Sequence, residues 1–159
     1  MAEIAPLRGI LYDEEKTGGM TKVVAPPYDV VSPEEQAAYH ASHPQNVLHI
    51  DLGARAAGDA HSYDWHARAA YKFNNWLADG FLIRHEKPAV YYNETDFTDP
   101  ATGQRRTRHG FVCLLRLEEF GAGAKVRPHE RTFSEHKAER LHHMELVQAH
   151  LSRSEERRV

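Results

Sequence analysis

The segment AVYYNETDFTDPATGQRRTRHGFVCLL (residues 89–115) decides the class of fold. Two stretches are rich in the β-branched and aromatic residues that favour strands. The first is Ala89–Tyr92, and the second is Thr107–Leu117, which continues two residues past the quoted segment. Between them, Asp99–Gly103 contains a proline and a glycine, as turns do. Two strand-forming stretches joined by such a turn predict an antiparallel hairpin.

Helical patterns precede the hairpin. Ser32, Pro33 and Glu35 match a capping box with proline in the first turn, which predicts a helix that runs to about Ser42. A longer helix is expected to end at Gly80, since glycine commonly follows the last helical residue. Its apolar residues recur at helical spacing and are interpreted as core: Ala69, Phe73, Trp76 and Leu77.

A third helix is predicted after the hairpin, where Thr132 and Glu135 match another capping box. Its apolar face would consist of Ala138, Leu141, Met144, Val147 and Leu151. Lys22–Ala25 and Asn46–Leu52 are expected to form two short strands. Together these elements predict a mixed α/β (α+β) fold, with a small mixed or antiparallel sheet that contains the hairpin and is flanked by helices.

Composition narrows the class of protein. The chain has 159 residues, 41% of them hydrophobic and 27% charged, which is ordinary for a globular domain. Its net charge of −3 argues against nucleic acid or an anionic membrane as a partner. The single cysteine, Cys113, excludes an internal disulfide, and the N-terminal sequence lacks the pattern of a signal peptide. We therefore expect a cytoplasmic protein without a membrane partner.

Histidine is unusually frequent, with 12 residues, and four of them recur at every seventh position: His129, His136, His143 and His150. On a helix, seven residues span roughly 10 Å along the axis, too far for one metal ion to bind two of these side chains. The helical wheel places the later members of this series on a solvated flank of the last helix, and His142 and His143 at the surface. No metal site is therefore predicted.

The candidate active-site segment is Arg127-Pro128-His129-Glu130-Arg131-Thr132, in the loop before the last helix. A carboxylate such as Glu130 accepts a proton from a substrate hydroxyl, and arginines such as Arg127 and Arg131 bind phosphate with two hydrogen bonds. The structural alternative is a surface ion pair between Glu130 and an arginine. We also expect Pro26-Pro27-Tyr28-Asp29 to lie close to His129 and Glu130, as the two walls of one cleft, because both segments connect strands to capped helices.

Five motifs occur in order along the chain and carry a resemblance to a known family. The chain resembles the uncharacterised prokaryotic family known as domain of unknown function 1015, from about Pro6 to Ser152. The motifs are Ala25-Pro26-Pro27-Tyr28-Asp29-Val30-Val31-Ser32, Asn46-Val47-Leu48-His49-Ile50, Trp76-Leu77-Ala78-Asp79-Gly80-Phe81-Leu82, Pro88-Ala89-Val90-Tyr91-Tyr92 and Val126-Arg127-Pro128-His129-Glu130-Arg131-Thr132.

The resemblance implies a function. In its later half that family is similar to the free serine kinases and to the wider ParB/sulfiredoxin superfamily of nucleotide-binding folds. This implies that Glu130 is the general base and that His129 orients or contacts the substrate. Apart from the resemblance, Arg127 and Arg131 are expected to bind the substrate or its phosphate through their positive charge, together with Tyr28 and Asp29 across the cleft. The implied cofactors are ATP or ADP with magnesium, and the implied partner is a small hydroxyl compound.

The sequence also departs from that pattern. The serine kinases bind phosphates with an Asp-Gly-His-His-Arg motif, and this sequence does not contain it. Residues 1–151 are expected to be the N-terminal part of the family domain, and the charged residues 152–159 a tail that does not match it. We therefore expect that the chain results from a truncation or frameshift and that it is inactive. We also expect it to self-associate through its last helix. The alternatives are a nucleotide-binding regulatory or ParB-like DNA-associated module without catalysis, and a non-catalytic structural domain.

Overall fold

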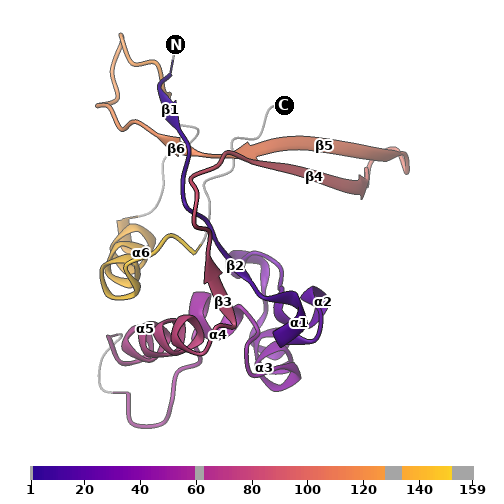
Figure 1. Ribbon diagram of the computed structural model, residues 1–159, viewed down its shortest axis with the longest axis vertical. Helices are drawn as coiled ribbons and strands as arrows, with labels where there is room; N and C mark the ends of the chain where they lie inside the picture. Colours follow the sequence, from indigo (N-terminus) through magenta and orange to yellow (C-terminus); the bar gives the residue numbers. More distant parts are fainter. Residues whose placement is uncertain (1, 60–62, 128–133, 152–159) are drawn as a thin grey trace. The chain divides into compact units, whose positions relative to one another are not determined.

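A computed structural model describes residues 2–59, 63–127 and 134–151 of the chain. It has the expected mixture of helices and small antiparallel sheets (Figure 1). The chain divides into two compact units. Unit 1 comprises Met1–Ile10 and Arg84–Pro128, and unit 2 comprises Leu11–Ile83 and His129–Val159. The fold is therefore of the predicted α+β class.

The predicted hairpin lies in unit 1. Strands β4 (Tyr91–Thr98) and β5 (Arg105–Val112) pair antiparallel along their whole length, from Tyr91 opposite Val112 to Thr98 opposite Arg105. At the turn, Gly103 donates its backbone N–H to the carbonyl of Asp99 and has φ of 69°, a conformation that favours glycine. The hairpin is confirmed, and β4 begins and ends later than the sequence pattern indicated.

Two further strand pairs complete the sheets. In unit 1, β1 (Ile4–Ala5) pairs antiparallel with β6 (Leu114–Leu115). Strands β2 (Ile10–Tyr12) and β3 (Leu82–Arg84) form another two-stranded sheet. Neither pair is predictable from the sequence, because strands of two or three residues are too short to show alternation.

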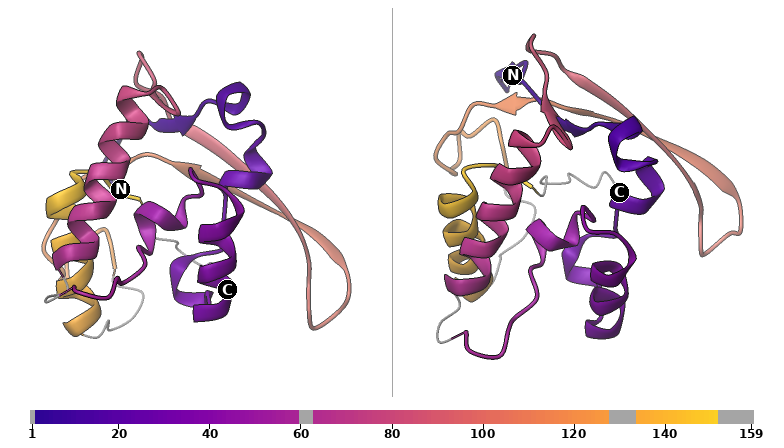
Figure 2. Two further views of the ribbon diagram at one scale, coloured as in Figure 1. Left: turned by 90° about the horizontal axis from the view of Figure 1, so that it is seen from below. Right: turned by 60° about the horizontal axis from the view of Figure 1, so that its bottom comes forward.

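The helices of the described chain belong to unit 2. In chain order they are α1 (Glu14–Thr17), α2 (Met20–Val23), the 3₁₀ turn η1 (Tyr28–Val30), α3 (Pro33–Ser42), α4 (Leu48–Asp51), α5 (Tyr63–Ala78) and α6 (Ser134–Val147). Figure 2 shows α5 and α6, which are far apart in the sequence, lying side by side. The core of unit 2 forms where α4 and α6 contact α5.

The capping box of α3 is confirmed. The Ser32 hydroxyl accepts a hydrogen bond from the backbone N–H of Glu35 at 3.2 Å, and the Glu35 carboxylate accepts one from the backbone N–H of Ser32 at 2.9 Å. The end of α5 is confirmed as well, because Gly80 follows it with φ of 74°. Both signals are local, so each is visible in the sequence alone. The capping box predicted for Thr132 and Glu135 lies outside the described residues.

The two short strands predicted in unit 2 are wrong, because both segments form helices. Lys22–Ala25 overlaps α2, and Asn46–Leu52 contains α4. The Asn46 side chain explains the difference: its oxygen accepts from the backbone N–H of Leu48, and its nitrogen donates to the carbonyls of Lys22 and Val24. This buried amide turns the chain into α4 and joins the two segments, which an alternation pattern of seven residues cannot reveal.

The apolar stripe predicted for α5 forms part of the core. Ala69, Phe73 and Trp76 are buried, while Leu77 is half-buried at the edge of the stripe. The other buried apolar side chains of unit 2 are Val23, Leu48, Ile50, Trp65, Leu82 and Val147. The aromatic residues of α5 therefore hold unit 2 together, as the sequence spacing indicated.

The apolar face predicted for α6 is partly wrong. Val147 is buried, but Leu141 is 57% exposed and Ala138 is also exposed. His143 lies on the face that packs against α5 and is only 1% exposed, so its predicted position at the surface is wrong. The helix is rotated from the predicted orientation because Arg140 forms a hydrogen bond with Asp51 of α4 and His143 forms one with His66 of α5.

Candidate functional site

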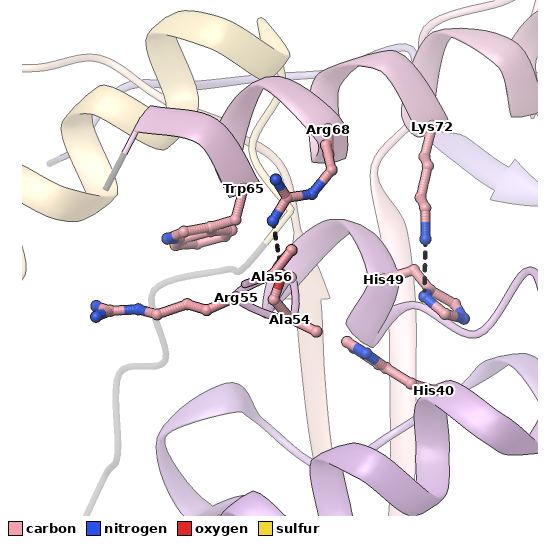
Figure 3. Close-up of a pocket in the computed structure, with 9 residues that line it drawn as sticks. His40, His49, Ala54, Arg55, Ala56, Trp65, Arg68 and Lys72 are labelled. Atoms are coloured by element: carbon pink, nitrogen blue, oxygen red, sulfur yellow. Dashed lines mark hydrogen bonds between the residues drawn. The ribbon is translucent and has the colours of Figure 1, made fainter. Parts of the chain in front are cut away.

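Unit 2 contains a cavity of about 280 Å³ (Figure 3). Four parts of the chain line it: α3, α4, the loop that follows α4, and α5. Its lining consists of His40, His49, Gly53, Ala54, Arg55, Ala56, Trp65, Arg68 and Lys72. Three of these nine residues carry permanent cations and none carries a carboxylate, so the lining favours a negatively charged ligand.

The loop after α4 is held by Arg68. Its guanidinium donates to both carboxylate oxygens of Asp59, at 2.6 and 2.7 Å, and to the carbonyl of Ala54 at 2.9 Å. The same carboxylate accepts from the backbone N–H of Ala56, and the hydrogen bonds from Arg68 and Ala56 lower the pKa of Asp59 to about 2. Because Asp59 balances the charge of Arg68, the main role of Arg68 is to shape this wall of the cavity.

Gly53 allows the loop to approach α5 closely. A Cβ atom at this position would lie 2.8 Å from a ring carbon of Trp65, closer than real Cβ contacts occur. The indole ring of Trp65 is buried beneath the loop and lines the cavity. The wall next to the cations is therefore apolar, formed by this ring and by Ala54 and Ala56.

Lys72 and His49 form the polar centre of the cavity. The Lys72 ammonium donates a hydrogen bond of 3.0 Å to Nδ1 of His49, so His49 carries its own proton on Nε2. The ring of His40 stacks on that of His49 with the centroids 4.4 Å apart. Burial, followed by the charges of Lys72 and His40, lowers the pKa of His49 to about 4. Near neutral pH His49 is therefore an uncharged acceptor that holds the ammonium group in place.

Apart from Arg68, which is paired with Asp59, two cationic residues line the cavity: Lys72 and Arg55. Lys72 is half-buried, and burial together with the charge of Arg68 lowers the pKa of its ammonium group. Arg55 is exposed, and Figure 3 shows its side chain extending away from Lys72 and His49. An anion that enters the cavity would meet Lys72 at its polar centre, while Arg55 adds positive charge at the rim.

A second polar cluster attaches α6 to the rest of unit 2. Arg140 donates to the carboxylate of Asp51 at 2.6 Å and to the carbonyl of the same residue at 3.1 Å. The guanidinium also lies over the ring of Tyr28, 4.2 Å from its centroid. Helix α6, which follows the candidate segment with Glu130, is thereby fixed to η1 and to α4, the helix that carries His49.

A buried histidine pair joins α5 to α6. His66 and His143 are each 1% exposed, and their Nδ1 atoms lie 2.8 Å apart. One of these nitrogens must donate and the other accept, so the contact needs at least one neutral ring. Burial lowers the pKa of both imidazoles, and the pKa of His66 falls to about 4. The pair is packed under the ring of Trp65 and acts as part of the core.

The structure describes only some of the residues selected from the sequence. Tyr28 is half-buried against Arg140, and its neighbour Asp29 is exposed. Arg127 is exposed in a loop of unit 1, next to Val126, whose backbone N–H donates to Glu118. His129, Glu130 and Arg131 lie outside the described residues. The single cleft formed by Tyr28, Asp29 and Glu130 therefore stays a prediction.

The family model described as "Protein of unknown function (DUF1015)" matches residues 4–153. The chain belongs to the DUF1015 family. The matched residues include the cavity, Tyr28 and the whole segment around Glu130, so the resemblance found in the sequence motifs is confirmed at the level of the family. Searches of curated proteins and of solved structures found no match.

The described part of this DUF1015 chain contains no helix with the length and apolar character needed to cross a membrane. Within the same residues, His, Cys, Asp and Glu side chains form no group of three that could hold a metal ion. The relationship to serine kinases and to the ParB/sulfiredoxin superfamily stays a prediction.

Sequence reasoning missed the residues of the cavity. One signal was present: Arg68 and Lys72 lie one helical turn apart, beside the apolar stripe of α5. His40 and His49 come from two other helices, one of which was predicted to be a strand. Their stacking depends on how α3 and α4 pack, which no spacing in the sequence specifies.

Proposed function

We propose that this DUF1015 protein binds a small phosphate-bearing ligand in the cavity at Lys72, and that its chemistry is related to the nucleotide-dependent phosphorylation of small hydroxyl compounds. One observation carries the proposal: Lys72 lies at the polar centre of the cavity with Arg55 at its rim, and none of the described lining residues is a carboxylate. Lysine is a common phosphate ligand because its ammonium group is a compact charge with three donors. An apolar wall beside it suits the carbon body of a metabolite.

The position of α6 supports a role for the segment that precedes it. Arg140 fixes α6 to α4, and α4 supplies His49 to the cavity. In the reaction proposed for the family, the residue at Glu130 takes the proton of the substrate hydroxyl while the hydroxyl oxygen forms a bond to phosphorus and the bond to the leaving group breaks. His129 orients the substrate, and Arg131, Tyr28 and Asp29 contact the substrate or its phosphate.

The resemblance implies ATP or ADP with magnesium as the phosphate donor. The cavity residues suit the phosphate part of such a donor, since they are cationic. They do not suit magnesium, which prefers carboxylate, phosphate and water oxygens, and we therefore assign no magnesium ligand to the cavity. The chemistry that this chain's described residues supply is the neutralisation of phosphate charge by Lys72.

Isothermal titration calorimetry with inorganic phosphate tests the proposal. Wild-type protein is compared with Lys72→Gln, which removes the central charge, and with Lys87→Gln, which removes an exposed lysine of unit 1 as a matched control. We expect Lys72→Gln to weaken phosphate binding by about tenfold or more, since a charge-assisted hydrogen bond is worth at least about 1.5 kcal/mol. Lys87→Gln should bind as the wild type does. Equal affinity of all three proteins would refute the proposed site.

A further inference from the structure

The hydrogen bond between Lys72 and His49 occupies the atoms that an anion would use. In the structure the ammonium group donates to Nδ1 of His49 at 3.0 Å. An oxyanion in the cavity is a stronger acceptor for that ammonium than a neutral imidazole nitrogen. Once Lys72 turns to the anion, the Nδ1 lone pair of His49 loses its donor and faces the same negative charge.

The charges around His49 come from every element that packs against it. His40 of α3 stacks on its ring, and Lys72 of α5 bonds its Nδ1. Arg68 of α5 and Arg55 of the neighbouring loop line the same cavity. Burial, followed by the charges of Lys72 and His40, opposes protonation of His49, whereas backbone hydrogen bonds at His43 and His40 favour it. None of the described residues that line the cavity is a carboxylate, so an entering anion would bring negative charge next to this ring.

We infer that the cavity recognises a compact divalent oxyanion, such as the phosphate of a phosphomonoester, by taking up a proton on His49. The oxyanion accepts hydrogen bonds from Lys72, a proton from solvent binds Nδ1, and the resulting imidazolium donates to a second oxygen. One proton is taken up from solvent for each anion bound, and the N–H bond at Nδ1 is the one covalent bond that forms. The inference rests on the proposed function, because it concerns the same cavity.

The size of the cavity limits the ligand. At about 280 Å³ it lies just below the range of roughly 300–1,000 Å³ that is typical of pockets for drug-sized ligands. A phosphate group with a short carbon body fits such a volume, with the carbon part against Trp65 and Ala54. A complete nucleotide would extend beyond the lining residues. The ligand class is therefore a small phosphomonoester, bound as its dianion.

Sulfate is the probe that separates proton uptake by the protein from titration of the ligand, because sulfate stays divalent throughout the range from pH 8 to pH 5.5. Its affinity is measured by calorimetry across this range. The bound anion raises the pKa of His49 above its value in the free protein, so affinity should rise as pH falls, by up to about tenfold per pH unit. His49→Gln should bind more weakly and lose the pH dependence, whereas the exposed control His150→Gln should keep it.

A second measurement needs no variant. The binding heat of wild-type protein at pH 6, recorded in two buffers of different ionisation enthalpy, gives the number of protons taken up, and we expect roughly 0.5–1 per sulfate. Binding of sulfate with zero proton uptake and constant affinity would overturn this inference and leave the proposed function standing. Failure of sulfate and phosphate to bind at any pH would overturn both.

Discussion

Acid sensitivity of the α5–α6 contact is the most quantitative prediction. His66 is buried against His143, and burial, followed by the charges of His143, His142 and Arg140, lowers its pKa from 6.5 to about 4. The unfolded chain therefore binds this proton at a higher pH than the folded chain does. The stability associated with neutral His66 is present above about pH 6.5 and is lost as pH falls from there towards 4.

The magnitude follows from the two pKa values. Between pH 7 and pH 5, protonation of His66 in the unfolded chain alone should lower the free energy of unfolding by about 1–2 kcal/mol. His143 and His49 change stability in the same direction, because burial lowers their pKa values as well. The contribution of His66 is therefore isolated by comparing wild-type protein with a variant that cannot be protonated at this position.

Urea unfolding followed by circular dichroism at pH 7, 6 and 5 supplies the comparison. His66→Gln should be less stable at pH 7, because it disturbs packing against Trp65, but should lose less stability on acidification than the wild type does. His150→Gln removes an exposed histidine and should reproduce the wild-type slope. If wild type and His66→Gln lose the same free energy between pH 7 and pH 5, His66 is not held neutral in the folded protein and the reasoning fails.

Three further predictions concern packing and activity. Arg140→Leu should lower the free energy of unfolding by about 2–4 kcal/mol, since it removes the guanidinium from the buried carboxylate of Asp51; unchanged urea stability would contradict this. Val147→Ala should lower the free energy of unfolding by about 1–3 kcal/mol, because Val147 is 2% exposed. Leu141→Glu should change it by less than about 0.5 kcal/mol, because Leu141 is 57% exposed. A larger loss for Leu141→Glu than for Val147→Ala would show that the buried face of α6 is misassigned. The purified chain should not phosphorylate free serine with ATP or ADP in a coupled assay, because the Asp-Gly-His-His-Arg motif is missing from its sequence; sustained turnover would show that phosphates are held by other residues.

The parts of the fold that the sequence predicts are those with local causes. The capping box at Ser32 and Glu35, the glycine that ends α5 and the turn of the hairpin each require only residues close together in the chain. Each of them is recognisable without knowledge of the rest of the fold. The same holds for the apolar stripe of α5, because its period matches one face of a helix.

The errors have causes that are distant in the sequence. Residues 46–52 alternate as a strand does, but the side chain of Asn46 is bound by carbonyls more than twenty residues away, which turns the chain into α4. His143 was predicted at the surface because a helical wheel counts imidazole as polar. Its partner, His66, lies 77 residues earlier and makes burial favourable by satisfying Nδ1.

The candidate site shows the same division. The segment around Glu130 is recognisable as a motif, and the family match includes it. The cavity is not recognisable in the sequence, because His40, His49 and Lys72 come from three helices and meet only after folding. Their chemistry depends on burial and on neighbouring charges, neither of which is a property of one segment.

The central claim is that a phosphate-bearing ligand binds beside Lys72 and His49, and nuclear magnetic resonance of the imidazole rings tests it most directly. Phosphate is titrated into protein with ¹⁵N-labelled histidines at constant pH. We predict saturable shifts of the ring nitrogens of His49 and His40, and no saturable shift for His85 and His109 of unit 1. Saturable shifts that appear only in unit 1, or none at the two cavity histidines, would contradict the account.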